Sequence, residues 1–253
     1  MKSRTVKKEV LRAAEMIADS RLPAVSTGAG MSRESGVRTF RGQEGFWKEY
    51  RAEDLASRKG LQKDPVLVWE WYRERLMATE DLKPHSGYAA LKRIQRKKGK
   101  LPIITQNVDG LHQKAGLTDV IELHGSLRTA SCLDQCGAPK SRMDDDLFRE
   151  LPPRCPCGSI LRPDVVLFGE QLPRDALERA FHIAGTCDLM LVIGTSMVVY
   201  PASSLPLIAL RRRVNVIEIN TEETPLTEME GTVHISGAAG TVLPEIVKAV
   251  YKT

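Results

Sequence analysis

Residues 105–126 read TQNVDGLHQKAGLTDVIELHGS and come directly after a short apolar run at 101–104. The apolar run predicts a buried strand, because short apolar stretches bounded by turn signals are typical of strands covered on both faces. Gln106, Asn107 and Asp109 stand at the point where that strand should end. In open α/β sheets, ligands bind at the carboxyl ends of the strands. The stretch therefore predicts an α/β fold with a site at this edge of the sheet.

A second short apolar run, at 120–123, leads directly into His124. Imidazole is the side chain whose ordinary pKa suits proton transfer near neutral pH. Any one of these polar residues could simply form a turn hydrogen bond or cap a strand, which is the commoner role. The set is different, because a glycine-rich loop earlier in the chain predicts the same site.

This loop reads TGAGMSRESG at 27–36 and follows an apolar stretch at 22–25. Gly28 and Gly30 would let the backbone approach a pyrophosphate closely, and backbone amides in such loops bind anions. The loop departs from the dehydrogenase pattern G-x-G-x-x-G, because Arg33 stands where the third glycine should be. Alone, the loop is weak support for a dinucleotide site.

The composition is that of a folded protein, with 42% hydrophobic residues in 253. This length suits one large domain or a domain with a small insert. No apolar run reaches the roughly 18 residues of a membrane span, and residues 1–20 lack the apolar core of a secretory signal, so we expect a cytoplasmic protein. The net charge of +5 is spread, with tight basic runs only at 96–98 and 211–213, which fit helix C-termini. Direct nucleic-acid binding is therefore not expected.

Four of the five cysteines lie close together, as CLDQC and CPC. In a cytosolic protein, clustered cysteines favour a metal over disulfides. Four thiolates in two close pairs suit a structural, tetrahedral zinc site with no open position for water, although one intervening residue in the second pair makes the geometry tight. Cys187 stands apart in an apolar stretch and should be buried packing. The expected ligands are Cys132, Cys136, Cys155 and Cys157.

Several motifs occur in a fixed order along the chain. They are GAGMSRESGVRTFRG at 28–42, TQNVDGLH at 105–112, ELHGS at 122–126, the clustered cysteines, RPDVVLFGE at 162–170, VIGTSMVVYPA at 192–202 and IEIN at 217–220. Several motifs in the right order are far more specific than any one of them. Together they closely resemble the sirtuins, the NAD-dependent protein lysine deacylases, over nearly the whole length.

The resemblance implies a doubly wound, Rossmann-like parallel sheet with a smaller domain made of a zinc module and a helical module. Alternating apolar runs and helical patterns are in keeping with a parallel sheet. The implied large part covers about 1–35, 85–127 and 164–253, with the helical module at about 36–84 and the zinc module at about 128–163.

The resemblance also implies the chemistry: NAD-dependent removal of acyl groups from protein lysines, giving nicotinamide, O-acyl-ADP-ribose and free lysine. His124 would be the general base on a ribose hydroxyl. Asn107 and Asp109 would hold the nicotinamide side of the site, and Gln106 the ribose. The implied cofactor contacts are Gly28, Ala29, Gly30, Phe40, Arg41, Gln106, Asn107, Asp109, Gly194, Thr195, Ser196, Asn220 and Ala238.

A predicted helix at 64–80 carries Tyr72 and Arg75, three residues apart and thus on one face. A Tyr-x-x-Arg pair here resembles the sirtuin subclass that removes acidic acyl groups such as succinyl and malonyl, without excluding acetyl. A guanidinium can bind a carboxylate through two parallel hydrogen bonds. The alternative is that Tyr72 packs in a core and Arg75 is solvated.

The segment 162–170 would form a strand-like edge on which the acyl peptide lies by backbone pairing. By resemblance, Val165 and Val166 would flank the acyl-lysine tunnel and Phe168 would continue its rim. The expected partners are thus acylated-lysine proteins or peptides. A half-buried strand with no ligand is the alternative.

Other readings remain open. The same site could transfer ADP-ribose to a protein, or the chain could be a zinc-containing nucleic-acid-binding module with NAD as a ligand. An ordinary dehydrogenase is disfavoured by the missing glycine. Arg33 and Arg38 have no assigned role, His85 should be structural, and His112 should cap a helix or face solvent.

Overall fold

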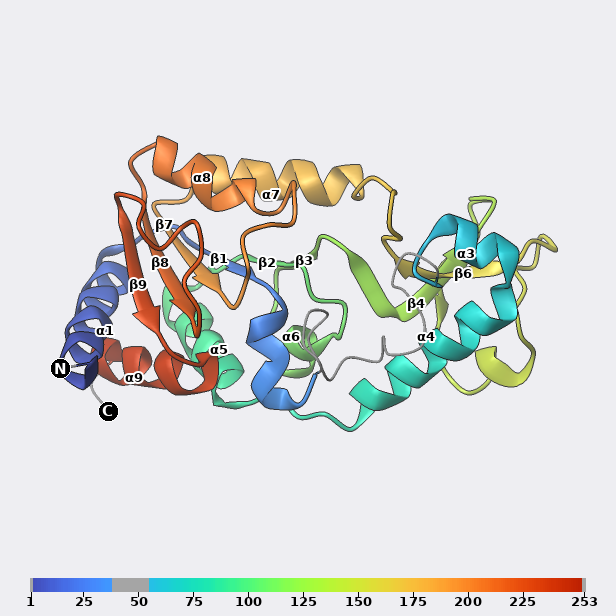
Figure 1. Cartoon of the computed structure of the whole chain (residues 1–253), viewed down its shortest axis with the longest axis horizontal. Coiled ribbons are helices and arrows are strands. Elements are labelled where there is room, and N and C mark those ends of the chain that lie inside the picture. Colours follow the sequence, from blue (N-terminus) through green and yellow to red (C-terminus); the bar gives the residue numbers. More distant parts are fainter. Residues whose placement is uncertain (1, 38–54, 252–253) are drawn as a thin grey trace.

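The computed structural model describes residues 2–37 and 55–251, so the predicted cofactor contacts Phe40 and Arg41, and also Arg38, lie outside the described residues. Six strands form a parallel sheet in the order β3-β2-β1-β7-β8-β9 (Figure 1). The strands are β1 (Pro23–Thr27), β2 (Ile103–Thr105), β3 (Val120–Glu122), β7 (Leu189–Ile193), β8 (Asn215–Asn220) and β9 (Thr232–Ser236).

The sheet has a switch point between β1 and β7, which pair in parallel. From β1 the chain adds β2 and β3 on one side, and it then returns to add β7, β8 and β9 on the other. This confirms the predicted doubly wound sheet, whose ligands bind where the strand order reverses. Every residue of β1 and of β7 is buried, which is why β7 reads as a continuous apolar run, while β1 ends in the buried polar residues Ser26 and Thr27.

Helices cover both faces of the sheet (Figure 1). Each face has its own apolar cluster, formed by side chains of the strands and of the helices above or below them. The helices of one face are α1 (Lys2–Asp19), α5 (Ser86–Lys98) and α9 (Ala239–Tyr251); those of the other are α7 (Arg174–Thr186) and α8 (Ser204–Arg211).

A second, smaller body lies at the end of the molecule away from α1 and α9 (Figure 1). It contains an antiparallel sheet in the order β5-β4-β6 and has its own core, in which the indole nitrogen of Trp69 donates to the Leu161 carbonyl at 3.0 Å. The module limits given above stay a prediction. Its elements are α3 (Arg58–Lys63), α4 (Pro65–Glu80), β4 (Gly125–Cys132), β5 (Ser141–Arg142), the 3-10 turn η3 (Leu147–Arg149) and β6 (Leu161–Val165).

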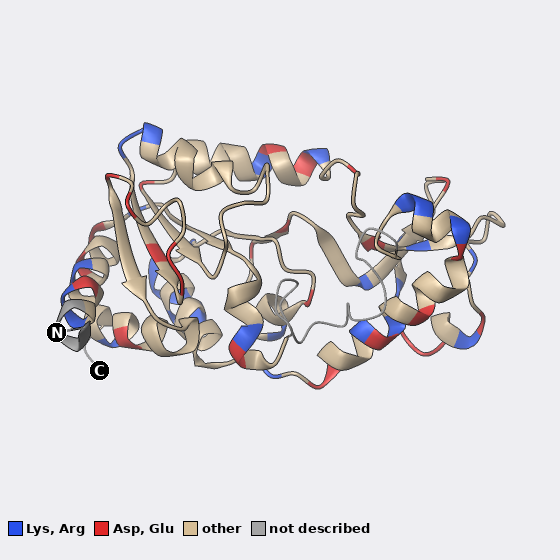
Figure 2. Ribbon diagram, viewed as in Figure 1, with Lys and Arg blue, Asp and Glu red and all other residues tan. Residues whose placement is uncertain are grey.

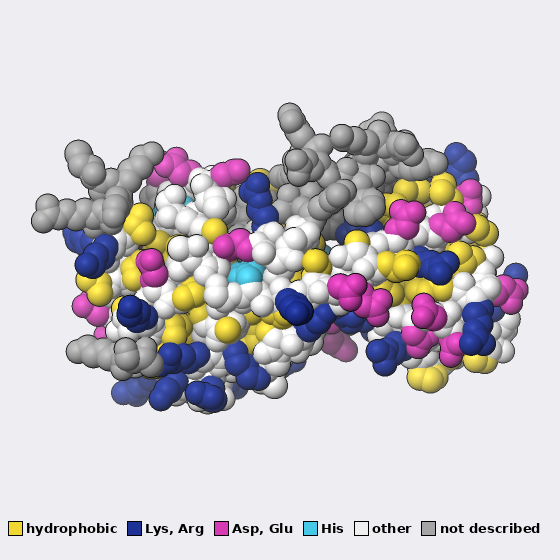
Figure 3. Space-filling model, turned by 90° about the horizontal axis from the view of Figure 1, so that it is seen from below, with side chains coloured by type: hydrophobic (Ala, Val, Ile, Leu, Met, Phe, Trp, Pro, Cys, Tyr) yellow, Lys and Arg dark blue, Asp and Glu magenta, His cyan; other side chains and the backbone are white. Residues whose placement is uncertain are grey.

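Local signals set the helix ends. The Asp64 side chain accepts from the Leu67 amide at 3.0 Å, and Pro65 occupies the first turn, which confirms the predicted helix start. The basic run at 96–98 ends α5 as expected. Acidic and basic residues are mixed on α1, α4 and α7 (Figure 2), while one face gathers Lys and Arg at the end that holds α1 and α9 (Figure 3). Within 2–37 and 55–251, no helix is long and apolar enough to cross a membrane.

Candidate active site

The glycine-rich loop after β1 lies directly against the loop after β7. The Gly28 amide donates to the Ile193 carbonyl at 3.0 Å, and the Gly30 amide donates to the Gly194 carbonyl at 2.8 Å. A Cβ added to Gly30 would lie 2.6 Å from the Gly194 Cα, closer than real Cβ atoms approach backbone. Glycine is therefore required here by the contact between the two loops.

Polar side chains from two further strand ends join these loops. Gln106 Nε2 donates to Thr195 Oγ1 at 3.2 Å, and Asn107 Nδ2 donates to the Gly28 carbonyl at 3.0 Å. Asn220, the last residue of β8, donates from Nδ2 to the Thr195 carbonyl at 2.9 Å. Four strands thus bring the predicted residues together at the switch point of the sheet.

The remaining predicted cofactor contacts lie around the same loops. Ala29 begins the 3-10 helix η1 (Ala29–Ser35), Ser196 is exposed directly after Thr195, and Ala238 is half-buried just before α9. Glycine backbone from two strand ends, with amide and hydroxyl side chains beside it, fits a dinucleotide, because open α/β sheets bind such ligands across the switch-point crevice.

The His124 ring is held in one orientation. It follows β3, it is partly buried, and its Nδ1 lies 3.0 Å from the Gln106 carbonyl oxygen. A carbonyl only accepts, so Nδ1 carries the proton and Nε2 holds the free lone pair. Burial lowers the pKa of His124, and the Gln106 carbonyl only partly opposes it. The ring is therefore neutral at neutral pH, as a general base must be.

The Asn107 and Asp109 side chains belong to a buried hydrogen-bond network. The Ser32 hydroxyl donates to Asp109 Oδ2 at 2.6 Å and accepts from Asn107 Nδ2 at 2.9 Å. The Tyr88 hydroxyl lies 2.9 Å from Ser32 Oγ, and it must donate there because the single Ser32 proton is already used. Burial raises the pKa of the Asp109 carboxyl, although bonds from Ser32 and the Leu111 amide oppose this.

Sequence reasoning missed Ser32 and Tyr88. Ser32 had one signal, its place between Gly30 and Gly36 in the glycine-rich loop. Tyr88 had none, because no motif surrounds it and the helical pattern at 85–98 places it on the inward face, where a core tyrosine is the default. Only the contact between α5 and η1 reveals its polar role.

His112 was expected to cap a helix or face solvent, and this prediction is wrong, because its side chain is buried. It lies on α6 (Leu111–Lys114), a one-turn helix, with its Nε2 3.2 Å from the buried Thr27 hydroxyl and its ring edge-on to Tyr88. Burial lowers the pKa of His112 to about 4. His112 is thus a neutral core residue. His85 is structural as predicted, since its Nδ1 accepts from the Gly87 amide at the start of α5.

Tyr72 and Arg75 lie in the core of the smaller body. Tyr72 is fully buried, which raises its pKa to about 12 against the opposing charges of Arg75 and Arg162. Arg75 is half-buried, and its guanidinium carbon lies 4.6 Å from the centre of the Trp71 ring. The alternative reading is half right, because Tyr72 packs in a core but Arg75 is not a solvated side chain.

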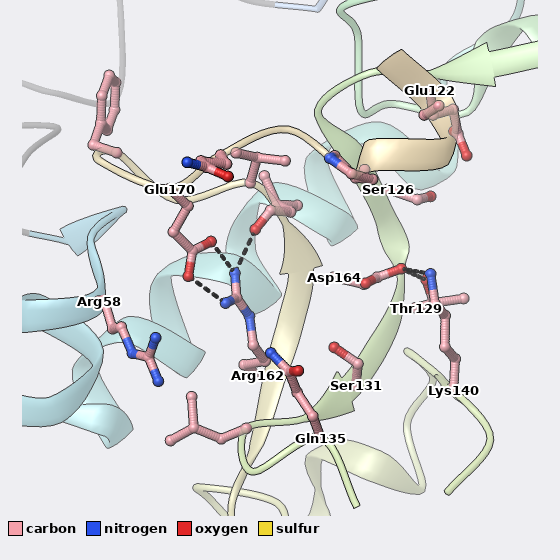
Figure 4. A pocket seen from close by; sticks show the side chains of 18 of the residues that line it. Arg58, Glu122, Ser126, Thr129, Ser131, Gln135, Lys140, Arg162, Asp164 and Glu170 are labelled. Atoms are coloured by element: carbon pink, nitrogen blue, oxygen red, sulfur yellow. Dashed lines mark hydrogen bonds and ion pairs between the residues drawn. The ribbon is translucent and has the colours of Figure 1, made fainter. Parts of the chain in front are cut away.

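A cavity of about 1370 Å³ has Ser126, Asp164 and Arg162 on its wall (Figure 4). Val165, Val166 and Phe168 line it, as do Gly125 and Ser126, which directly follow His124. The Val166 amide donates to the His124 carbonyl at 2.9 Å, so the predicted rim and the predicted base are tied together by backbone.

The four clustered cysteines converge. Their sulfur atoms all lie within 4.8 Å of one another, with Cys132–Cys157 at 3.6 Å and Cys136–Cys155 at 3.5 Å. Tetrahedral zinc with Zn–S bonds of about 2.3 Å holds its sulfurs about 3.8 Å apart. The tight second pair lies in a turn closed by the Gly158 amide on the Cys155 carbonyl at 2.8 Å, and both of its sulfurs belong to the cluster. The cluster is compatible with zinc, and Cys187 lies buried elsewhere, as expected.

Comparison with known proteins agrees with this geometry. A Sir2 family model matches residues 28–201. The chain is 45% identical over 243 residues to a Thermococcus kodakarensis protein named NAD-dependent protein deacylase, covering 94% of each. It is also 45% identical over 241 residues to NAD-dependent protein deacylase 2 of Pyrobaculum aerophilum, covering 95% of each.

Solved structures give the same result. A crystal structure of a Sir2 homologue–NAD complex matches with a TM-score of 0.88 and 43% identity, over 95% of this chain and 93% of that one. A Sir2–p53 peptide–NAD⁺ structure matches with a TM-score of 0.83 and 31% identity, over 94% of this chain and 97% of that one. The order of motifs, the fold and both sets of relatives agree: the chain belongs to the Sir2 family.

Proposed function

We propose that this protein is an NAD-dependent protein lysine deacylase. The observation that carries the proposal is the His124 ring just after β3, whose protonated Nδ1 is fixed on the carbonyl of Gln106, a residue whose side chain reaches Thr195 at the switch point. The deacylase names of the relatives and the NAD in a matching structure support the same activity.

The residues at the switch point fit NAD as the cofactor. The backbone of Gly28 and Gly30 would receive the pyrophosphate, and Asn220 the adenosine ribose. When bound, NAD supplies a ribose carbon activated by its nicotinamide bond and a ribose hydroxyl that finally carries the acyl group. His124 Nε2 would take the proton from that hydroxyl, while Asn107 and Asp109 orient the nicotinamide side. A positioned general base contributes about 10²–10⁴-fold to such a step.

The substrate would be an acylated lysine in an extended peptide. A Sir2 structure with a p53 peptide supports this class of substrate. We propose that the peptide lies as an extended strand along residues 165–170. Val165 and Val166 would then flank the acyl-lysine, and Phe168, half of whose surface is exposed, would form the rim.

Incubation of an acetyl-lysine peptide with NAD tests the function. Mass spectrometry should show loss of the acetyl group from the peptide, together with nicotinamide and O-acetyl-ADP-ribose in equal amounts. A peptide that gains ADP-ribose and keeps its acetyl group would instead support the transferase alternative. Nicotinamide release with no change in any peptide would contradict both.

The acyl specificity is proposed to include acidic groups, through Tyr72 and Arg75. Arg75→Met should lower kcat/KM for a succinyl-lysine peptide about tenfold to a hundredfold and leave an acetyl-lysine peptide within about threefold. The reason is that a hydrogen bond to a charged group contributes about 1.5–3 kcal/mol, and 1.4 kcal/mol is a factor of ten. Steady-state kinetics on paired peptides measures this.

Arg73→Met is the matched control, because Arg73 lies on the same helix but is exposed. This variant should leave kcat/KM unchanged for both the succinyl-lysine and the acetyl-lysine peptide. An equal loss on both peptides with Arg75→Met would show that Arg75 supports the fold of α4 and does not read the acyl group.

A further inference from the structure

The cavity beside the rim carries charge that its own ion pairs do not cancel. Arg162 binds Glu170 through two bonds, Nη1–Oε1 at 2.5 Å and Nη2–Oε2 at 2.7 Å (Figure 4). Lys140 pairs with Asp164 at 2.6 Å. These pairs neutralise the middle of the cavity wall.

Two cations of α3 also line the cavity, Arg58 and Lys59. Both are exposed, and within the described part of the chain neither has an ion-pair partner. Among the described residues of the cavity wall, Glu170 is already bound by Arg162, so Arg58 and Lys59 are left without a neutralising carboxylate. The described part of the wall is therefore net positive next to α3.

Arg58 lies at the proposed peptide rim. Ser57 pairs with Phe168 as an isolated parallel bridge, and the Phe168 amide donates to the Ala56 carbonyl at 2.7 Å. Arg58 is the next residue along. Burial raises the pKa of Glu170, but hydrogen bonds from Arg162 and the Leu167 amide and the charges of Arg162 and Arg58 outweigh it, so the pKa is lowered. Arg58 is thus close enough to affect a carboxylate on the rim.

The far end of the cavity has the opposite character. Glu122 lies there, across from Arg58 (Figure 4). Asp175 and Arg179 of α7 also line the cavity, and Arg179 is already paired with Asp119. Burial raises the pKa of Glu122, which weakens its negative charge. Asp175 has no such burial, because its side chain is exposed. An extended peptide that crosses the cavity would therefore meet cations near α3 and carboxylates near α7.

We infer that Arg58 and Lys59 select acyl-lysine sites with an acidic residue close to the modified lysine. This rests on the proposed deacylase function. Successive residues of an extended peptide advance about 3.3 Å with side chains on alternate sides, so a residue a few positions from the acyl-lysine would face α3. Exposed charge pairs are weak, so the preference for Glu over the neutral Gln should be about twofold to fivefold and should shrink with added salt.

The test uses acetyl-lysine peptides that differ at a single position. Each of the three positions on either side of the lysine carries Glu, Gln or Lys in turn, and kcat/KM is measured with saturating NAD. One position should prefer Glu over Gln and disfavour Lys. Arg58→Glu should reverse the Glu-to-Gln ratio at that position, because the cation is replaced by an anion.

Lys63→Glu is the matched control. Lys63 lies on the same helix, is equally exposed and makes the same charge change, but it does not line the cavity. Its Glu-to-Gln ratio should equal that of the unmodified protein. Each ratio compares two peptides with the same preparation of one variant. A smaller fraction of folded protein lowers both kcat/KM values equally and leaves their ratio unchanged.

The outcomes separate the two proposals. If no peptide is deacylated, the proposed function is wrong. If all peptides are deacylated with the same kcat/KM, the function stands and this selectivity is wrong. If Arg58→Glu and Lys63→Glu change the ratio equally, the effect is general attraction by the protein surface, which also overturns the inference.

Discussion

Replacing His124 by alanine should lower kcat by about 10²–10⁴-fold while leaving NAD binding within about threefold. The expected loss is that of a positioned general base. NAD binding should survive because the loops proposed to hold the pyrophosphate are joined by backbone bonds from Gly28 to Ile193 and from Gly30 to Gly194, neither of which involves the imidazole. Nicotinamide release measures turnover, and titration calorimetry measures binding of NAD.

The pH dependence gives an independent check on the same ring. Protonation removes the lone pair on Nε2, so activity should fall as the pH drops through the His124 pKa. Burial lowers that pKa. The acid limb of kcat/KM should therefore have its midpoint below about 6.5, the ordinary value for histidine. A midpoint above 7 would contradict a buried, neutral base.

His182→Ala is the control for loss of an imidazole elsewhere. His182 is exposed on α7, and its carbonyl, not its ring, accepts a bond from Thr186. Turnover should be unchanged. If His124→Ala were to keep comparable turnover, the catalytic role given to His124 would be wrong.

The strand-end residues could be predicted from the sequence, because the chemistry there follows local rules. Gln106 and Asn107 come directly after a short buried run, and Asn220 is the last residue of another. A parallel sheet places such ends along one edge, so knowing the strands is nearly enough to know the site. The glycines at 28 and 30 gave the same edge a second signal.

What the sequence could not reveal depends on contacts between distant segments. Tyr88 and Ser32 are 56 residues apart and meet only because α5 packs beside the glycine-rich loop. His112 lay on a predicted helix, and no periodicity shows which side of a one-turn helix is covered. The charge left on Arg58 is also invisible in the sequence, since it remains only after Arg162 has paired with Glu170.

Removing one cysteine of the cluster should have an effect of a different kind from removing the histidine. Cys155→Ser should abolish binding of one zinc per chain and lower the unfolding temperature by roughly 5 °C or more, since losing several kcal/mol moves Tm by about 2–4 °C per kcal/mol in a chain of this size. Cys155 is buried in the same core as Trp69 and Leu161. Metal analysis and calorimetry measure both effects.

The kinetic consequence follows from where the cysteines lie. Cys132 ends β4 and pairs with Leu161 of β6, whose last residue, Val165, belongs to the proposed peptide rim. Loosening this sheet should therefore raise KM for the peptide more than KM for NAD, whose proposed site belongs to the larger sheet. His124→Ala should instead act mainly on kcat, so the two variants should separate the two bodies of the molecule.

Cys187→Ala is the control for the cluster, because Cys187 is equally buried but packs in a separate apolar cluster on the large sheet. It should keep one zinc per chain. Four sulfur ligands leave no open position for water, so zinc has no chemical step to perform here. If Cys155→Ser kept its metal and its Tm, or if it lost kcat with both KM values unchanged, the structural role proposed for the cluster would be wrong.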